Sequence, residues 1–78
     1  MLFRSPQAGL TQIDAIMAAG ELDDYHLAHA ARADMYRRLG RSKDARAAYE
    51  RALSLTQQLP ERRFLARRIT QLPKTTTG

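Results

Sequence analysis

Two closely spaced histidines raise the question of a metal site. His26 and His29 lie three residues apart, and the acids Asp23, Asp24 and Asp34 flank them. In a helix, residues at i and i+3 share a face, so two imidazoles and one carboxylate could bind a transition metal there. The recognised zinc-binding helix motif instead spaces its histidines at i and i+4 around a glutamate, and no third ligand here has a defined spacing. We therefore expect no metal ion. His29 should fill an aromatic packing position, and His26 should lie at the rim of the surface.

No group of residues indicates catalysis. Ser5, Ser42 and Ser54 are explained as helix caps or surface residues, and the chain contains no cysteine. No nucleophile is accompanied by a base and an orienting group, and no glycine-rich loop is suited to cradling phosphate. We expect a protein that is not an enzyme and that uses no cofactor and no small-molecule substrate.

The most concentrated charge in the sequence is a set of arginines near its C-terminal end. Four of them fall within two helical turns: Arg62, Arg63, Arg67 and Arg68. Arg63 and Arg67 form a like-charged i,i+4 pair, which is mildly unfavourable when both are exposed. We expect something acidic to face them. The candidates are a partner protein, nucleic-acid phosphate, or acids of this chain such as Glu50; a solvated face without a partner is the remaining interpretation.

An aromatic residue within this arginine set helps to rank the candidates. The sequence assigns Phe64 and Leu65 to the core of the domain, which leaves no exposed ring beside the charges. Proteins that bind single strands combine a basic surface with exposed aromatic platforms. We therefore expect a protein partner and keep direct DNA contact as an alternative.

Composition favours one small helical protein of the cytoplasm. Of the 78 residues, 44% are hydrophobic, and there is no cysteine that could form a disulfide. No apolar run approaches the roughly 20 residues needed to cross a bilayer, and the first residues lack the apolar core of a signal peptide. The net charge of +5 belongs to the C-terminal half, since residues 41–78 carry nine Lys/Arg and three Asp/Glu. We expect no membrane contact.

Apolar spacing and helix-ending residues predict four helices. Their ranges are about 6–19, 23–39, 42–57 and 60–72, with a disordered tail at 73–78. Ser5 and Ser42 are the expected caps of the first and third helices. The Asp23-Asp24 pair should lie at the positive end of the second helix, and Gly40 should be the left-handed residue that follows it.

The second and third helices carry the spacing of a tetratricopeptide (TPR) repeat of about 34 residues. The matching positions follow the order small, aromatic, turn glycine, small, aromatic, small: Ala33, Tyr36, Gly40, Ala45, Tyr49 and Ala52. The alanines should let two antiparallel helices approach closely, while the tyrosines fill the gaps to neighbouring helices. Because a single repeat cannot bury both its faces, the flanking helices must act as neighbours. We expect one all-α domain over 1–78, in which four antiparallel helices form a degenerate TPR-like repeat with one extra helix on each side.

Four segments of this region also resemble a known family. The runs YHLAHAARAD, RRLGR, AAYERAL and ERRFLARR, in this order and at these distances, resemble the C-terminal extension of a subgroup of bacterial extracytoplasmic-function RNA polymerase sigma factors. These extensions are TPR-like helical domains behind the promoter-binding modules. The resemblance extends from about Leu10 to Leu72, and the sigma modules themselves have no counterpart in the 78 residues. It implies a role in transcription initiation or its regulation, through contact with sigma modules or core RNA polymerase.

The expected contact surface combines the arginine set with a polar rim on the second helix. The rim comprises His26, Arg32, Asp34, Arg37 and Arg38. Two alternatives to the transcription role stay open. One is a generic TPR-like adaptor unrelated to transcription, and the other is a basic helical protein that binds nucleic acid.

Overall fold

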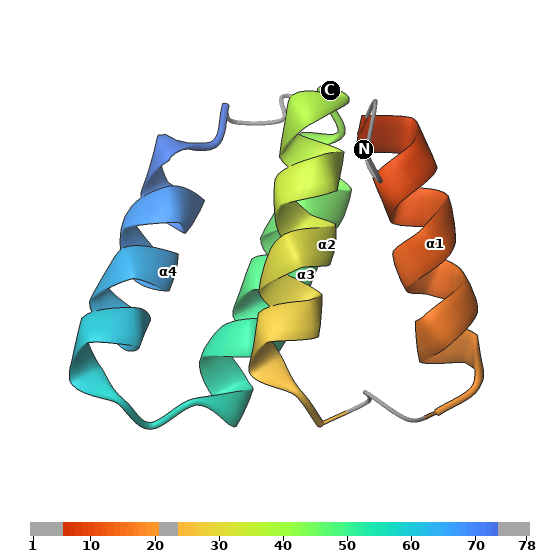
Figure 1. Ribbon diagram of the computed structural model, residues 1–78. Coiled ribbons are helices and arrows are strands. Elements are labelled where there is room, and N and C mark those ends of the chain that lie inside the picture. The colour runs from red at the N-terminus through yellow and green to blue at the C-terminus, as the bar shows by residue number, and fades with distance from the viewer. Residues whose placement is uncertain (1–5, 21–23, 74–78) are drawn as a thin grey trace.

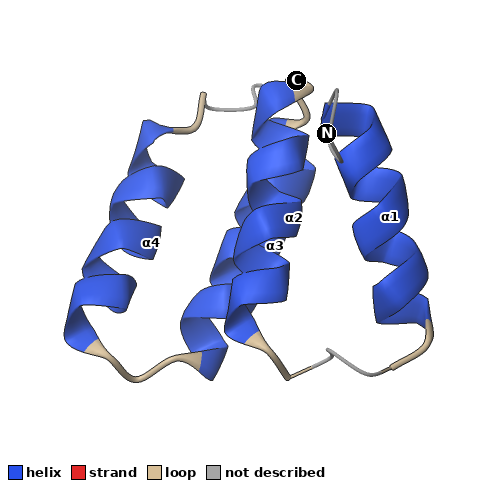
Figure 2. Ribbon diagram, viewed as in Figure 1, coloured by secondary structure: helices blue, strands red, loops and turns tan. Residues whose placement is uncertain are grey.

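The computed structural model describes residues 6–20 and 24–73, and this part of the chain forms four helices (Figure 1, Figure 2). They are α1 (Pro6–Ala18), α2 (His26–Arg38), α3 (Ser42–Leu55) and α4 (Leu59–Gln71). No strand occurs within the described ranges, which confirms the predicted all-α class. The predicted cap Ser5 and the acid Asp23 lie outside those ranges. Of the tail predicted to be disordered, only Pro73 is described.

Successive helices run in alternating directions, with α2 and α3 at the centre (Figure 1). α2 packs most extensively on α3, while α1 packs on α2 and α4 packs on α3. Residues 39–41 join α2 to α3, and residues 56–58 join α3 to α4. Connections this short hold sequential helices antiparallel and side by side.

Small residues fill the contact between α2 and α3. Ala33 of α2, together with Ala45 and Ala52 of α3, is 0% exposed. Because an alanine side chain is a single methyl group, two helices that meet through alanines bring their backbones close together. The smallest side chains therefore lie where the two central helices are most closely packed.

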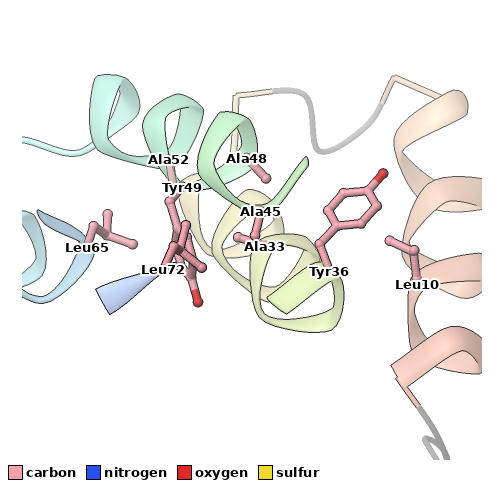
Figure 3. Close-up of a cluster of buried hydrophobic side chains, with 9 residues drawn as sticks. All are labelled: Leu10, Ala33, Tyr36, Ala45, Ala48, Tyr49, Ala52, Leu65 and Leu72. Carbon is pink, nitrogen blue, oxygen red and sulfur yellow. The ribbon is translucent and has the colours of Figure 1, made fainter. Parts of the chain in front are cut away.

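Two tyrosines extend the core outward from this alanine contact. Figure 3 shows Tyr36 pointing toward Leu10 of α1, whereas Tyr49 lies on the opposite side, near Leu65 of α4 and Leu72, which follows α4. All five side chains are buried. Each tyrosine thus fills the space between the central pair and one outer helix.

Gly40, two residues after the last helical residue of α2, has a left-handed backbone conformation, with φ of +77°. Its N–H donates to the carbonyl of Arg37 at 3.0 Å, and the N–H of Arg41 donates to the carbonyl of Tyr36 at 2.9 Å. This is the Schellman pattern, which satisfies the last carbonyls of a helix and needs a residue without Cβ at its centre. The guanidinium of Arg41 lies 4.7 Å from the centroid of the Tyr36 ring and covers it.

The predicted start of the second helix is wrong by about three residues. Asp24 lies in a turn, Tyr25 has extended backbone, and the first helical residue is His26. Acids near a helix N-terminus contribute only a few tenths of a kcal/mol when exposed, so the acidic pair does not determine where α2 begins.

The third helix also differs from its predicted ends. Ser42 is its first helical residue rather than its cap; Arg41 occupies the N-cap position and makes no side-chain cap hydrogen bond. Instead, Arg41 Nε donates to Asp44 Oδ2 at 2.9 Å. α3 ends at Leu55, two residues early, because Thr56 is extended and buried. Its hydroxyl donates to Glu61 Oε1 at 3.0 Å, which fixes the turn into α4.

The assignment of Phe64 to the core is wrong. The core-facing stripe of α4 consists of the buried Leu65 and the partly buried Ile69, and it continues to the buried Leu72 just after the helix, at the i, i+4, i+7 spacing of one helix face. Phe64 precedes Leu65 by one residue and is therefore rotated by about 100° away from that stripe. Its side chain is 51% exposed.

Candidate interaction surface on helix α4

The four arginines of α4 do not form one surface. Arg62 points back toward α3, where its Nη1 donates to the carbonyl of Leu53 at 2.7 Å and to the carbonyl of Thr56 at 2.8 Å. These carbonyls belong to the end of α3, whose last C=O groups have no partner within the helix. Arg62 therefore caps α3 and fastens α4 to it.

Removing this cap is expected to lower stability. Arg62→Ala should reduce the free energy of unfolding by about 1–2 kcal/mol, because two charge-assisted hydrogen bonds to partly buried carbonyls are lost. The matched control is Arg63→Ala, the same change at an exposed neighbour, which should stay within about 0.5 kcal/mol. Urea denaturation followed by circular dichroism measures both. Equal effects of the two substitutions would contradict the capping role.

Arg63 and Arg67 are exposed on the outer face of α4. Within residues 6–20 and 24–73, neither has an acid within ion-pair distance, Glu50 included. The guanidinium of Arg68 lies 5.3 Å from the centroid of the Phe64 ring. The outer face of α4 thus presents two unpaired cations and a third that is stacked on an exposed ring.

An apolar hollow lies beside these arginines, between the first turns of α2 and α4. It is lined by His26, Leu27, Ala30, Glu61, Phe64 and Leu65, and its surface is almost wholly apolar. Leu27 is 48% exposed, and with Phe64 it leaves a hydrophobic rim in contact with solvent. Phe64 also lines a second hollow with Arg67, Arg68 and Gln71.

His26 and Glu61 close one end of the apolar hollow. His26 Nε2 lies 2.5 Å from Glu61 Oε1, so the start of α2 contacts the start of α4. His29 is buried. No group of three or more possible metal ligands occurs in the part of the chain that the structure describes.

The rest of the predicted polar rim on α2 is occupied by contacts within the chain. Arg32 Nε lies 2.9 Å from Asp14 Oδ1 of α1. Asp34 pairs with Arg37 at 2.6 Å and with Arg38 at 3.1 Å. The hydrogen bond to Asp34 raises the pKa of the Arg37 guanidinium above its ordinary value; desolvation opposes this shift, and the Tyr49 side chain adds to it.

The structure therefore divides the predicted contact residues into two groups. His26, Arg32, Asp34, Arg37 and Arg62 have partners within the chain, whereas Arg63, Arg67 and Arg68 remain on the outer face of α4. Sequence reasoning missed the hydrophobic rim of Leu27 and Phe64. The one-residue offset of Phe64 from the buried stripe was the available indication.

Comparison of the chain with protein-family models, with curated protein sequences and with solved structures gives no match. No helix among the described residues is long and apolar enough to cross a bilayer.

Proposed function

We propose that this chain is a non-catalytic interaction domain of the cytoplasm that acts in transcription initiation by contacting sigma modules or core RNA polymerase. The observation that carries the proposal is the ordered resemblance of four segments to the C-terminal extension of extracytoplasmic-function sigma factors. The last of these segments, ERRFLARR, contains the exposed residues Arg63, Phe64 and Arg67 of α4.

The packing of the central helices supports a TPR-like interpretation of this domain. The alanines at the TPR positions lie at the α2–α3 contact, and Tyr36 and Tyr49 fill the spaces on either side of it. Repeats of this kind keep small residues between their stacked helices and bind partners on the surface that the stacked helices form.

An acidic surface is the partner chemistry that suits α4. Arg63 and Arg67 are like charges at i,i+4, an arrangement that costs a few tenths of a kcal/mol in the isolated helix. A carboxylate placed between them would remove that repulsion and add attraction. Exposed charges mainly accelerate and orient association, so binding should weaken as the salt concentration rises.

Capture of a polymerase component tests the proposal. The tagged chain should retain sigma promoter-binding modules or core RNA polymerase at low salt. The double substitution Arg63→Glu plus Arg67→Glu should weaken retention at least about tenfold, the effect of losing about 1.4 kcal/mol of binding free energy. The matched control is Lys43→Glu plus Arg51→Glu, the same charge change on exposed positions of α3.

Three outcomes of this experiment have different meanings. If only the double substitution on α4 reduces retention, the result supports the proposal. If the double substitutions on α3 and α4 reduce retention equally, the attraction is nonspecific and the proposal is contradicted. Absence of binding by the unsubstituted chain at low salt also contradicts it, and leaves the generic TPR-like adaptor and nucleic-acid binding as the interpretations.

One observation favours a second candidate, binding of single-stranded nucleic acid. Phe64 is exposed beside Arg67 and Arg68, and this is the combination of ring and charge that such proteins use. This candidate predicts that a fluorescent oligodeoxythymidine binds with an affinity that falls steeply with salt and drops on Phe64→Ala. Unchanged anisotropy in dilute buffer would exclude it.

A further inference from the structure

From the two hollows that meet at Phe64, we infer that this chain binds an acidic protein segment that inserts one aliphatic side chain between α2 and α4. The inference rests on the proposed interaction function and assigns its site and partner chemistry. Phe64 separates the apolar hollow, toward the start of α4, from the cationic hollow, toward its end. A ligand that covers this ring reaches both.

The size of the apolar hollow selects the anchoring side chain. Its volume is about 80 Å³. This is about half the volume of an enclosed cavity that holds benzene, so the hollow suits a branched aliphatic group such as that of leucine, isoleucine or valine. Leu27, Ala30 and Leu65 supply the apolar walls, and the burial of Leu27 and Phe64 by a partner would remove exposed hydrophobic surface from water.

The charges around the two hollows fix the orientation of the segment. The carboxylate of Glu61, at one end of the apolar hollow, already contacts His26 and the Thr56 hydroxyl. The positive charge lies beyond Phe64, in the second hollow, on Arg67 and Arg68. One helical turn, about 5.4 Å, separates Phe64 from these arginines. A helical segment therefore carries its carboxylate three or four residues from its aliphatic anchor.

Charge also argues against a second copy of this chain as the occupant. The chain has a net charge of +5, and the described surface around Phe64 is basic, so two copies would repel each other there. An acidic helix bound in the groove would instead place an apolar side chain in the apolar hollow and neutralise the arginines beside it.

Titration of the isotope-labelled chain with a synthetic peptide tests the inference. The probe is a short acidic peptide with one leucine and glutamates at the i+3 and i+4 positions beyond it. Amide signals of Leu27, Ala30, Phe64 and Arg67 should shift in the nuclear magnetic resonance spectrum. Replacing the leucine of the probe by alanine should weaken its affinity about tenfold or more.

Substitutions in the chain separate the groove from general charge. Phe64→Ala and Arg67→Glu should each weaken the affinity for the probe about tenfold, whereas Lys43→Glu, a charge change of the same size at an exposed position of α3 outside both hollows, should weaken it by no more than about threefold. Phe64 is half-exposed, so Phe64→Ala should keep its helix content and urea midpoint, and these two measurements serve as the folding control.

Several results would overturn the inference. They are amide shifts that do not depend on the leucine of the probe, equal losses of affinity with Lys43→Glu and Arg67→Glu, shifts at the same amides on concentrating the chain alone, stronger shifts with oligodeoxythymidine, or no shifts at all. The proposed function is tested separately, because polymerase capture that requires Arg63 and Arg67 but tolerates Phe64→Ala would keep that function and exclude the groove.

Discussion

Replacing Tyr49 by alanine is expected to remove a large part of the free energy that keeps the chain folded. Tyr49 is 2% exposed and is the largest fully buried side chain in the described residues. Truncating a buried aromatic side chain costs about 3–5 kcal/mol, from lost burial and from the cavity that remains. A domain of 78 residues has a total stability of about 4–12 kcal/mol, so the loss is comparable to the lower part of that range.

Two controls identify the cause of the loss. Tyr49→Phe keeps the ring and removes only the hydroxyl, so it should cost about 1 kcal/mol or less. Tyr25→Ala makes the same truncation at a side chain that is 47% exposed and should stay near 0.5 kcal/mol. Urea denaturation followed by circular dichroism compares all three. A small effect of Tyr49→Ala would mean that α4 is not held on α3 through this ring.

The helical class and the central pairing were predictable because both depend on local spacing. The positions of Ala33, Ala45 and Ala52 repeat at helical intervals, and Gly40 breaks the pattern at the turn. Short connections then leave little choice but an antiparallel pair. Helix ends were less accurate, because capping preferences of about 0.5–2 kcal/mol compete with contacts of similar strength, such as that of Thr56 with Glu61.

The candidate surface was only partly predictable, since it depends on contacts between residues that are distant in sequence. Four adjacent arginines look equivalent in a sequence, yet the turn at residues 56–58 brings the last carbonyls of α3 to Arg62 and leaves Arg63 and Arg67 outside. No local pattern indicates that His26 meets Glu61. The exposure of Phe64, in contrast, was predictable from the sequence. Adjacent residues of a helix point about 100° apart, so Phe64 and Leu65 could not both face the core.

Enlarging one alanine at the α2–α3 contact is the second substitution expected to have a large effect. Ala45 is 0% exposed and belongs to the same buried cluster as Ala33. Leucine at this position adds three carbon atoms that can be accommodated only if the two helices move apart or adopt strained rotamers. Overpacking costs about 1–3 kcal/mol, and we expect a value near the upper end because Ala45 and its neighbour Ala33 are both completely buried.

Ala47→Leu is the matched control, since it makes the same change on the same helix at an exposed position. It should change the free energy of unfolding by no more than about 0.5 kcal/mol, because leucine and alanine are both good helix formers. Urea midpoints measured side by side should therefore separate the two variants clearly. If Ala45→Leu is as well tolerated as Ala47→Leu, the helices are not in close contact at Ala45. The TPR-like interpretation would then lose its physical basis, because alanine at that position matters only where the two backbones are close.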